Sequence, residues 1–119
     1  MVESTRDPSG AVVQVQVTCA DHAEADLIAD ALVSASLAAC VHISPITAVY
    51  RWMDRVERET EIELRITTTR AARDEVVARI GELHSYDLPA IWWSDLDGGA
   101  EAVEWVVRSV RSNGTARSR

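Results

Sequence analysis

The chain has 119 residues, of which 47% are hydrophobic and 26% charged, and its formal net charge is −7 at pH 7. This composition is typical of one globular domain, and the acidic balance argues against nucleic acid as the main partner. No apolar run is long enough to span a membrane, and residues 1–10 lack the basic-then-apolar order of a secretory signal. We therefore expect a cytoplasmic protein with a flexible leader at 1–10, a single domain at 11–111 and a flexible tail at 112–119.

The first expected elements are a strand and a helix. Residues 11–18 alternate valine with glutamine, which predicts a half-buried strand. Asp21 then begins a helix that should end near Ser36. Glu24 stands three residues after Asp21, as in a capping box, where the two side chains satisfy amides at the start of the helix.

A long hairpin is expected next. Residues 38–52 form a second extended run, interrupted by Pro45, and residues 56–68 return after a tight turn at Asp54-Arg55. If the alternation is regular, four acids share one face of the returning strand: Glu57, Glu59, Glu61 and Glu63. Such a row can attract a cation, but it is more often a solvated face that discourages edge pairing.

The remaining elements complete a recognisable order. Thr68 or Thr69 should cap a second helix with a buried side over residues 72–83, and residues 88–93 form a fourth strand. A last short helix is lined by Val103, Val106, Val107 and Val110. The order β-α-β-β-α-β, then α, predicts an α+β, ferredoxin-like fold with an antiparallel sheet. Right-handed crossovers place the first strand between the third and fourth, with the second strand outside the third.

This topology brings residues 84–87 beside the end of the first strand and the start of the first helix. The polar side chains expected to meet there are Thr18, Cys19, Asp21, His22 and His84. Cys and His together suit copper(I) or zinc, so Cys19 and His84 are candidate metal ligands. The alternatives are that Cys19 is a small buried hydrophobe, that His84 stabilises a helix end and that His22 faces solvent.

Two further expectations are negative. The chain has no G-x-S-x-G, no glycine-rich phosphate loop and no H-E-x-x-H, so we expect no enzymatic activity. Cys19 and Cys40 fall on parallel strands separated by a third strand, so we expect no disulfide between them.

Several pieces of sequence, taken in order, resemble the CutA divalent-cation tolerance family over residues 11–110. They are Ala31-Leu32 through Leu37-Ala38-Ala39-Cys40-Val41, Tyr50-Arg51-Trp52, Glu57 and Glu61, Thr68, His84-x-Tyr86-x-x-Pro89, and Trp105. The chain departs from the family pattern at four positions, where Lys, Gly, Pro and Glu are usual: Thr67, Asp54, Ser85 and Ala90. Ala90 cannot donate a carboxylate, so any metal should bind weakly.

The resemblance implies a homotrimer with clefts between subunits and a role in tolerance of divalent metals, chiefly copper, without a known reaction. The residues that it implies for a cleft or interface are Tyr50, Trp52, Glu61, Thr68 and Tyr86. Three functions stay open: a metal-binding tolerance protein that uses the His84 region, a trimeric sensor of a small ligand in the inter-subunit cleft, and a trimeric scaffold.

Overall fold

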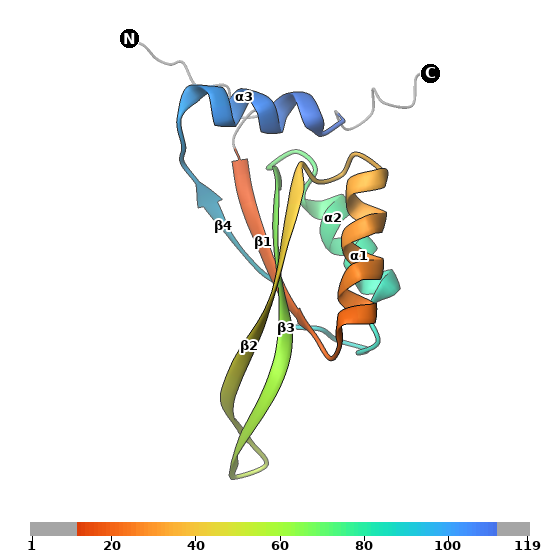
Figure 1. The fold of residues 1–119 in the computed structure, drawn as a ribbon, viewed down its shortest axis with the longest axis vertical. Coiled ribbons are helices and arrows are strands. Elements are labelled where there is room, and N and C mark those ends of the chain that lie inside the picture. The colour runs from red at the N-terminus through yellow and green to blue at the C-terminus, as the bar shows by residue number, and fades with distance from the viewer. Residues whose placement is uncertain (1–11, 112–119) are drawn as a thin grey trace.

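The computed structural model describes residues 12–111, so the predicted leader at 1–10 and tail at 112–119 lie outside the described residues (Figure 1). The elements, in chain order, are β1 (Val12–Cys19), α1 (His22–Ser34), β2 (Cys40–Trp52), β3 (Arg55–Thr69), α2 (Arg73–Leu83), β4 (Trp92–Leu96) and α3 (Ala100–Ser109). The strands form one antiparallel sheet in the order β2-β3-β1-β4, which confirms the predicted fold class and strand order.

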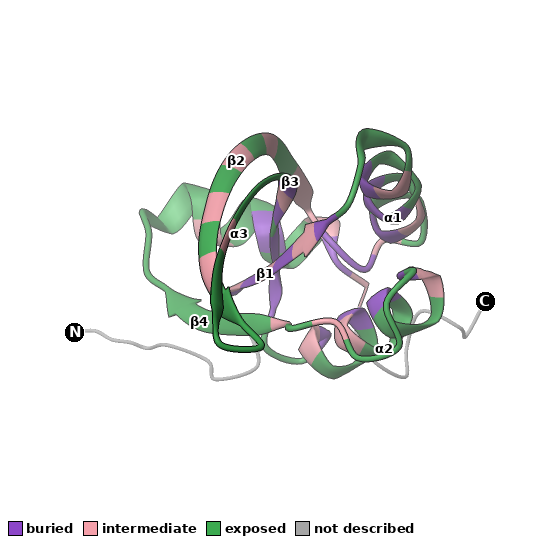
Figure 2. Ribbon diagram, turned by 90° about the horizontal axis from the view of Figure 1, so that it is seen from below, coloured by how far each residue is buried: buried purple, intermediate pink, exposed green. Residues whose placement is uncertain are grey.

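Helices α1 and α2 cover one face of the sheet, and α3 lies across the end of the sheet where β1 begins (Figures 1 and 2). Val13, Val15 and Val17 of β1 point to the covered face, as their alternation predicts. They pack with Ile28 of α1 and Ile80 of α2 in the main core. None of the helices described in residues 12–111 is long and apolar enough to cross a membrane.

The other side of the sheet carries a helix only at its end, where Val106 of α3 packs against Val12, and we call it the helix-free face. Beyond Val12, this face is polar on the two central strands. Its residues follow from the register, since side chains of directly paired residues point the same way. On β1 and β3 these pairs are Gln14–Thr67, Gln16–Arg65 and Thr18–Glu63. On β2 and β3 the four acids pair with Ser44, Ile46, Ala48 and Tyr50, so the predicted row of glutamates does share one face.

The β2–β3 hairpin extends beyond both helices, as Figure 1 shows. Pairing is continuous from Cys40–Thr67 to Trp52–Arg55, past Pro45 on the edge strand. The Cα radius of gyration is 15.8 Å, whereas a compact domain of about 100 residues has about 13 Å. The hairpin therefore projects outside the compact part of the domain.

The tip of this hairpin lies one residue earlier than predicted. Met53 and Asp54 occupy the turn, with φ of 50° and 64°. Two positive φ values make a type I′ turn, whose twist matches that of the flanking strands. The predicted turn at Asp54-Arg55 was wrong by one position because Arg55 pairs with Trp52 and belongs to β3.

Replacing Asp54 with glycine should stabilise the hairpin. Glycine adopts positive φ without the Cβ penalty, so the Asp54→Gly variant should gain about 0.5–1 kcal/mol in free energy of unfolding. Urea denaturation followed by tryptophan fluorescence measures this change. Asp87→Gly is the matched control, because Asp87 lacks positive φ and its replacement should not stabilise. Equal effects of the two variants would contradict the strain at Asp54.

Two other predicted boundaries need correction. Strand β4 begins at Trp92 rather than Leu88, because Pro89 has no N–H to donate and pairing with β1 stops at Gln16–Trp92. Helix α2 begins at Arg73, and Thr69 Oγ1 accepts from the Ala72 amide in the preceding turn instead of capping the helix. Helix α3 begins at Ala100, directly after Gly99, and contains three of the four valines predicted to line it, with Val110 at its C-cap.

The two cysteines are free, as predicted. Cys19 pairs with Ile62 and Cys40 with Thr67, so they lie five positions apart along β3, or about 17 Å. Ile62 points to the covered face and Thr67 to the helix-free face. Both the distance and the opposite orientation exclude a bridge.

Candidate functional site

Three potential ligand groups meet where β1 ends, α1 begins and α2 ends. Cys19 Sγ, a carboxylate oxygen of Glu24 and a ring nitrogen of His84 all lie within 4.8 Å of one another. We call them the Cys19–Glu24–His84 cluster. Cys19 and His84 are buried and Glu24 is half-buried. The predicted convergence of Cys19 and His84 is therefore present.

The hydrogen bonds of His84 define its tautomer. Nε2 lies 2.8 Å from the backbone carbonyl of Thr18, and because a carbonyl only accepts, Nε2 carries the proton. Nδ1 accepts from the Tyr86 amide at 3.1 Å and lies 3.4 Å from Glu24 Oε2. Metal-binding histidines are commonly oriented by such a bond from the other ring nitrogen to a carbonyl. His84 is thus held with Nδ1 toward the cluster.

Glu24 is the member that the sequence did not identify as a ligand. Its amide donates to Asp21 Oδ1 at 2.9 Å, so Asp21 caps α1 as predicted. Its carboxylate turns back beyond the helix and accepts from the amide and the hydroxyl of Ser85, with Ala20 N at 3.4 Å. The capping-box spacing could have identified Glu24 as a candidate ligand. A side chain that reaches back from the first turn of α1 also reaches the end of β1, where Cys19 lies.

Burial controls the chemistry of Cys19. Burial first, and then the nearby carboxylates of Glu24 and Asp21, raise the pKa of the Cys19 thiol to about 12. The thiol is therefore protonated at neutral pH and would have to release its proton to coordinate a metal. A sulfur, an imidazole nitrogen and a carboxylate oxygen together fit zinc, or copper(I) through the sulfur and nitrogen.

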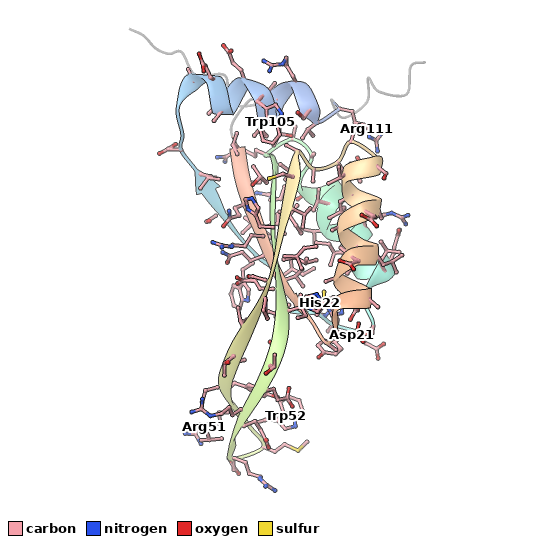
Figure 3. All side chains as sticks on the ribbon, in the orientation of Figure 1. Asp21, His22, Arg51, Trp52, Trp105 and Arg111 are labelled. Atoms are coloured by element: carbon pink, nitrogen blue, oxygen red, sulfur yellow. The ribbon has the colours of Figure 1, made fainter. Side chains whose placement is uncertain are left out.

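The other polar residues expected here have separate roles. Thr18 contributes only its carbonyl, and Asp21 caps α1. His22 is exposed, and Figure 3 shows Asp21 and His22 together near the start of α1. The Tyr86 ring stacks on His84 with centroids 4.8 Å apart and planes tilted by 56°. Burial, and then the carboxylates of Glu61 and Glu59, raise the pKa of Tyr86.

Three predicted cleft or interface residues lie away from the cluster. Tyr50 is on the outer part of the hairpin, and Trp52 is near its tip with 59% of its surface exposed (Figure 3). Thr68 is fully buried on the covered face, where its hydroxyl donates to the Leu37 carbonyl at 2.6 Å. In this chain Thr68 therefore ties β3 to the segment after α1.

A shallow hollow lies on the helix-free face, where β4 begins beside β1. It is lined by Gln16, Val17, Thr18, Glu63, Ala90 and Trp92. Trp92 is 69% exposed, so the lining combines an exposed tryptophan with the acidic residue Glu63. Its lining includes Thr18, the residue whose carbonyl orients His84.

Comparison with protein families gives one match along most of the chain. Residues 13–109 match the family described as CutA1 divalent ion tolerance protein. The divalent-cation tolerance protein CutA of Thermus thermophilus is 36% identical over 94 residues, which cover 77% of this chain and 91% of that protein. The chloroplastic protein CutA of Arabidopsis thaliana is 31% identical, and the match covers 84% of this chain but 56% of that longer protein.

Solved structures agree with this match. CutA1 from Oryza sativa superposes with a TM-score of 0.83 at 29% identity, covering 90% of this chain and 100% of the other. A protein from Archaeoglobus fulgidus, described as a periplasmic divalent cation tolerance protein CutA, gives a TM-score of 0.79 at 30% identity, covering 84% and 99%. The α+β architecture with an antiparallel sheet is common to these proteins and to this chain.

Proposed function

Because this chain belongs to the CutA1 divalent ion tolerance protein family, we propose that it acts in tolerance by binding a thiophilic cation, zinc or copper, at the Cys19–Glu24–His84 cluster. The family is named for ion tolerance and not for a reaction, so binding rather than catalysis is the proposed activity. The observation that carries the proposal is the convergence of three ligand atoms within 4.8 Å from separate elements.

The ligand types favour soft or borderline cations. Magnesium and calcium prefer sites built from several oxygen ligands, and this cluster offers the carboxylate of Glu24 alone. Zinc accepts sulfur, nitrogen and oxygen together, and copper(I) prefers sulfur and nitrogen. Three protein ligands leave room for water or another ligand.

Loss of the His84 imidazole should weaken zinc binding at least about tenfold, because a directly coordinating nitrogen is removed. Isothermal titration of zinc into wild-type protein and His84→Ala measures the change. His22→Ala is the matched control, since that imidazole is exposed at the start of α1 and outside the cluster. Glu24→Gln removes the carboxylate charge at nearly constant size. Equal zinc affinities for wild type, His84→Ala and Glu24→Gln would contradict the site.

We also propose that the protein acts as a homotrimer. Strands β2 and β4 are both edges of the sheet, and edges left unpaired tend to associate. Large apolar side chains near the hairpin tip are open to solvent in the single chain: Trp52, Met53 and Val56 are 59%, 78% and 66% exposed. Packing against neighbouring subunits would bury them.

Replacing Trp52 with alanine should weaken this assembly, because a large apolar side chain would be lost from the interface. Light scattering on a sizing column should give a trimer for wild type and a shift toward monomer for Trp52→Ala at micromolar concentration. Leu27→Ala, on the exposed side of α1, is the control and should stay trimeric. A monomeric wild-type protein would contradict the proposal.

A second candidate function is the sensing of a small ligand in a cleft between subunits. The hollow lined by Trp92 and Glu63 favours it, because an exposed tryptophan together with an acidic residue suits a small organic cation. Saturable binding of such a compound without metal, lost in Trp92→Ala, would support this function over cation tolerance.

A further inference from the structure

The loop after α2 already occupies the ligand atoms of the cluster. The Ser85 amide donates to Glu24 Oε2, and the Ser85 hydroxyl lies 3.2 Å from Glu24 Oε1. The Tyr86 amide donates to His84 Nδ1 at 3.1 Å. Three hydrogen-bond donors from two adjacent residues thus face the carboxylate and the imidazole nitrogen that a cation would need.

We infer that Ser85 and Tyr86 compete with the cation for these atoms, so that cation binding releases the loop. The inference rests on the proposed function and adds a conformational consequence to it. His84 Nδ1 has a single lone pair and cannot accept the Tyr86 amide and coordinate a metal at once. The Glu24 carboxylate has several lone pairs, so its competition with Ser85 is partial.

Besides these hydrogen bonds, the loop is held by the contact of the Tyr86 ring with His84 and by few buried side chains. Between residues 85 and 91 only Pro89 and Ile91 are partly buried, and Leu88 is 92% exposed. Segments with few buried apolar contacts open at low free energy. Loss of the bonds to Glu24 and His84 would therefore release Ser85 and leave Tyr86 held by its ring against His84 alone, in the segment that leads directly into β4.

The Ser85→Pro variant tests the competition. Proline removes both the amide donor and the hydroxyl donor at this position. The preceding residue, His84, has φ −76° and ψ 146°, which suits a residue before proline. We expect Ser85→Pro to bind zinc about tenfold more tightly than wild type, because hydrogen bonds to a charged group no longer oppose the metal. Ser85→Ala loses only the hydroxyl and should lie between the two.

A second measurement uses the wild-type chain, so it does not depend on how a variant folds. Hydrogen exchange of the Tyr86 amide should accelerate several-fold when the protein is saturated with zinc, because its acceptor is taken by the metal. The Ile28 amide, in the middle of α1, should exchange at an unchanged rate.

The outcomes separate this inference from the proposed function. Tighter zinc binding by Ser85→Pro together with faster exchange at Tyr86 supports the inference. Zinc binding that depends on His84, with an unchanged Tyr86 amide and no tightening in Ser85→Pro, overturns the inference and leaves the proposed function standing. Absence of zinc binding by wild type overturns both.

Discussion

Zinc affinity should rise about tenfold per pH unit between pH 7 and pH 8.5. The pKa of the Cys19 thiol is about 12, so the thiol is protonated throughout this range. Coordination releases its proton, and each unit of pH increase then favours the bound state by one factor of ten. Competition against a chelator of known affinity at each pH measures the slope.

Cys19→Ser provides the control for this slope. The serine hydroxyl is similar in size and stays protonated, so the variant should bind zinc through Glu24 and His84 with weaker affinity and without the thiol proton. If the zinc affinity of the wild type changed with pH as little as that of Cys19→Ser, Cys19 would not coordinate the metal. The metal site would then be reduced to the carboxylate and the imidazole.

The free energy of unfolding of the metal-free protein should fall by about 2–3 kcal/mol between pH 9 and pH 11 through Cys19 alone. The thiol pKa is about 12 in the folded protein, against a reference value of 9.0. Below pH 9 both states hold the proton. Above it the unfolded chain loses the proton while the folded chain keeps it, so ionisation stabilises the unfolded state.

Urea denaturation at pH 8 and pH 11, with a chelator present, tests this prediction. Tyrosines also titrate at high pH, so the relevant quantity is the loss in wild type minus the loss in Cys19→Ala. The variant has no thiol and should lose less stability by the stated amount, although its stability at pH 8 is lower because of the cavity left in the core. Equal losses would show that the folded protein ionises Cys19 as easily as the unfolded chain does.

The strand order and the meeting of Cys19 with His84 were predictable because they depend on patterns that the backbone repeats. Alternating valines locate β1, and the capping pair Asp21–Glu24 locates the start of α1. Because the connections between these elements are right-handed, their order determines which loops lie at the same end of the sheet. Side-chain conformations were not needed to predict that Cys19 and His84 lie close together.

Local geometry was less predictable. Residues 88–93 form one largely apolar run, whereas pairing with β1 stops at Gln16–Trp92 although β1 itself continues to Cys19. The role of Glu24 depends on the direction of one side chain, which a capping-box spacing leaves open between its own helix and a neighbouring loop. The place of Glu24 in the cluster and its hydrogen bonds to Ser85 could therefore not be predicted from the sequence.

Because the two cysteines point to opposite faces of the sheet, only one of them is open to thiol reagents in the folded protein. Cys40 is partly accessible, whereas Cys19 is 1% exposed and holds its proton. A maleimide dye added to the folded protein should therefore label Cys40 and spare Cys19, since both access and thiolate content control the reaction. One fluorophore per chain can then be attached without mutagenesis, and energy transfer between donor-labelled and acceptor-labelled chains would test whether the proposed trimer forms and exchanges its subunits.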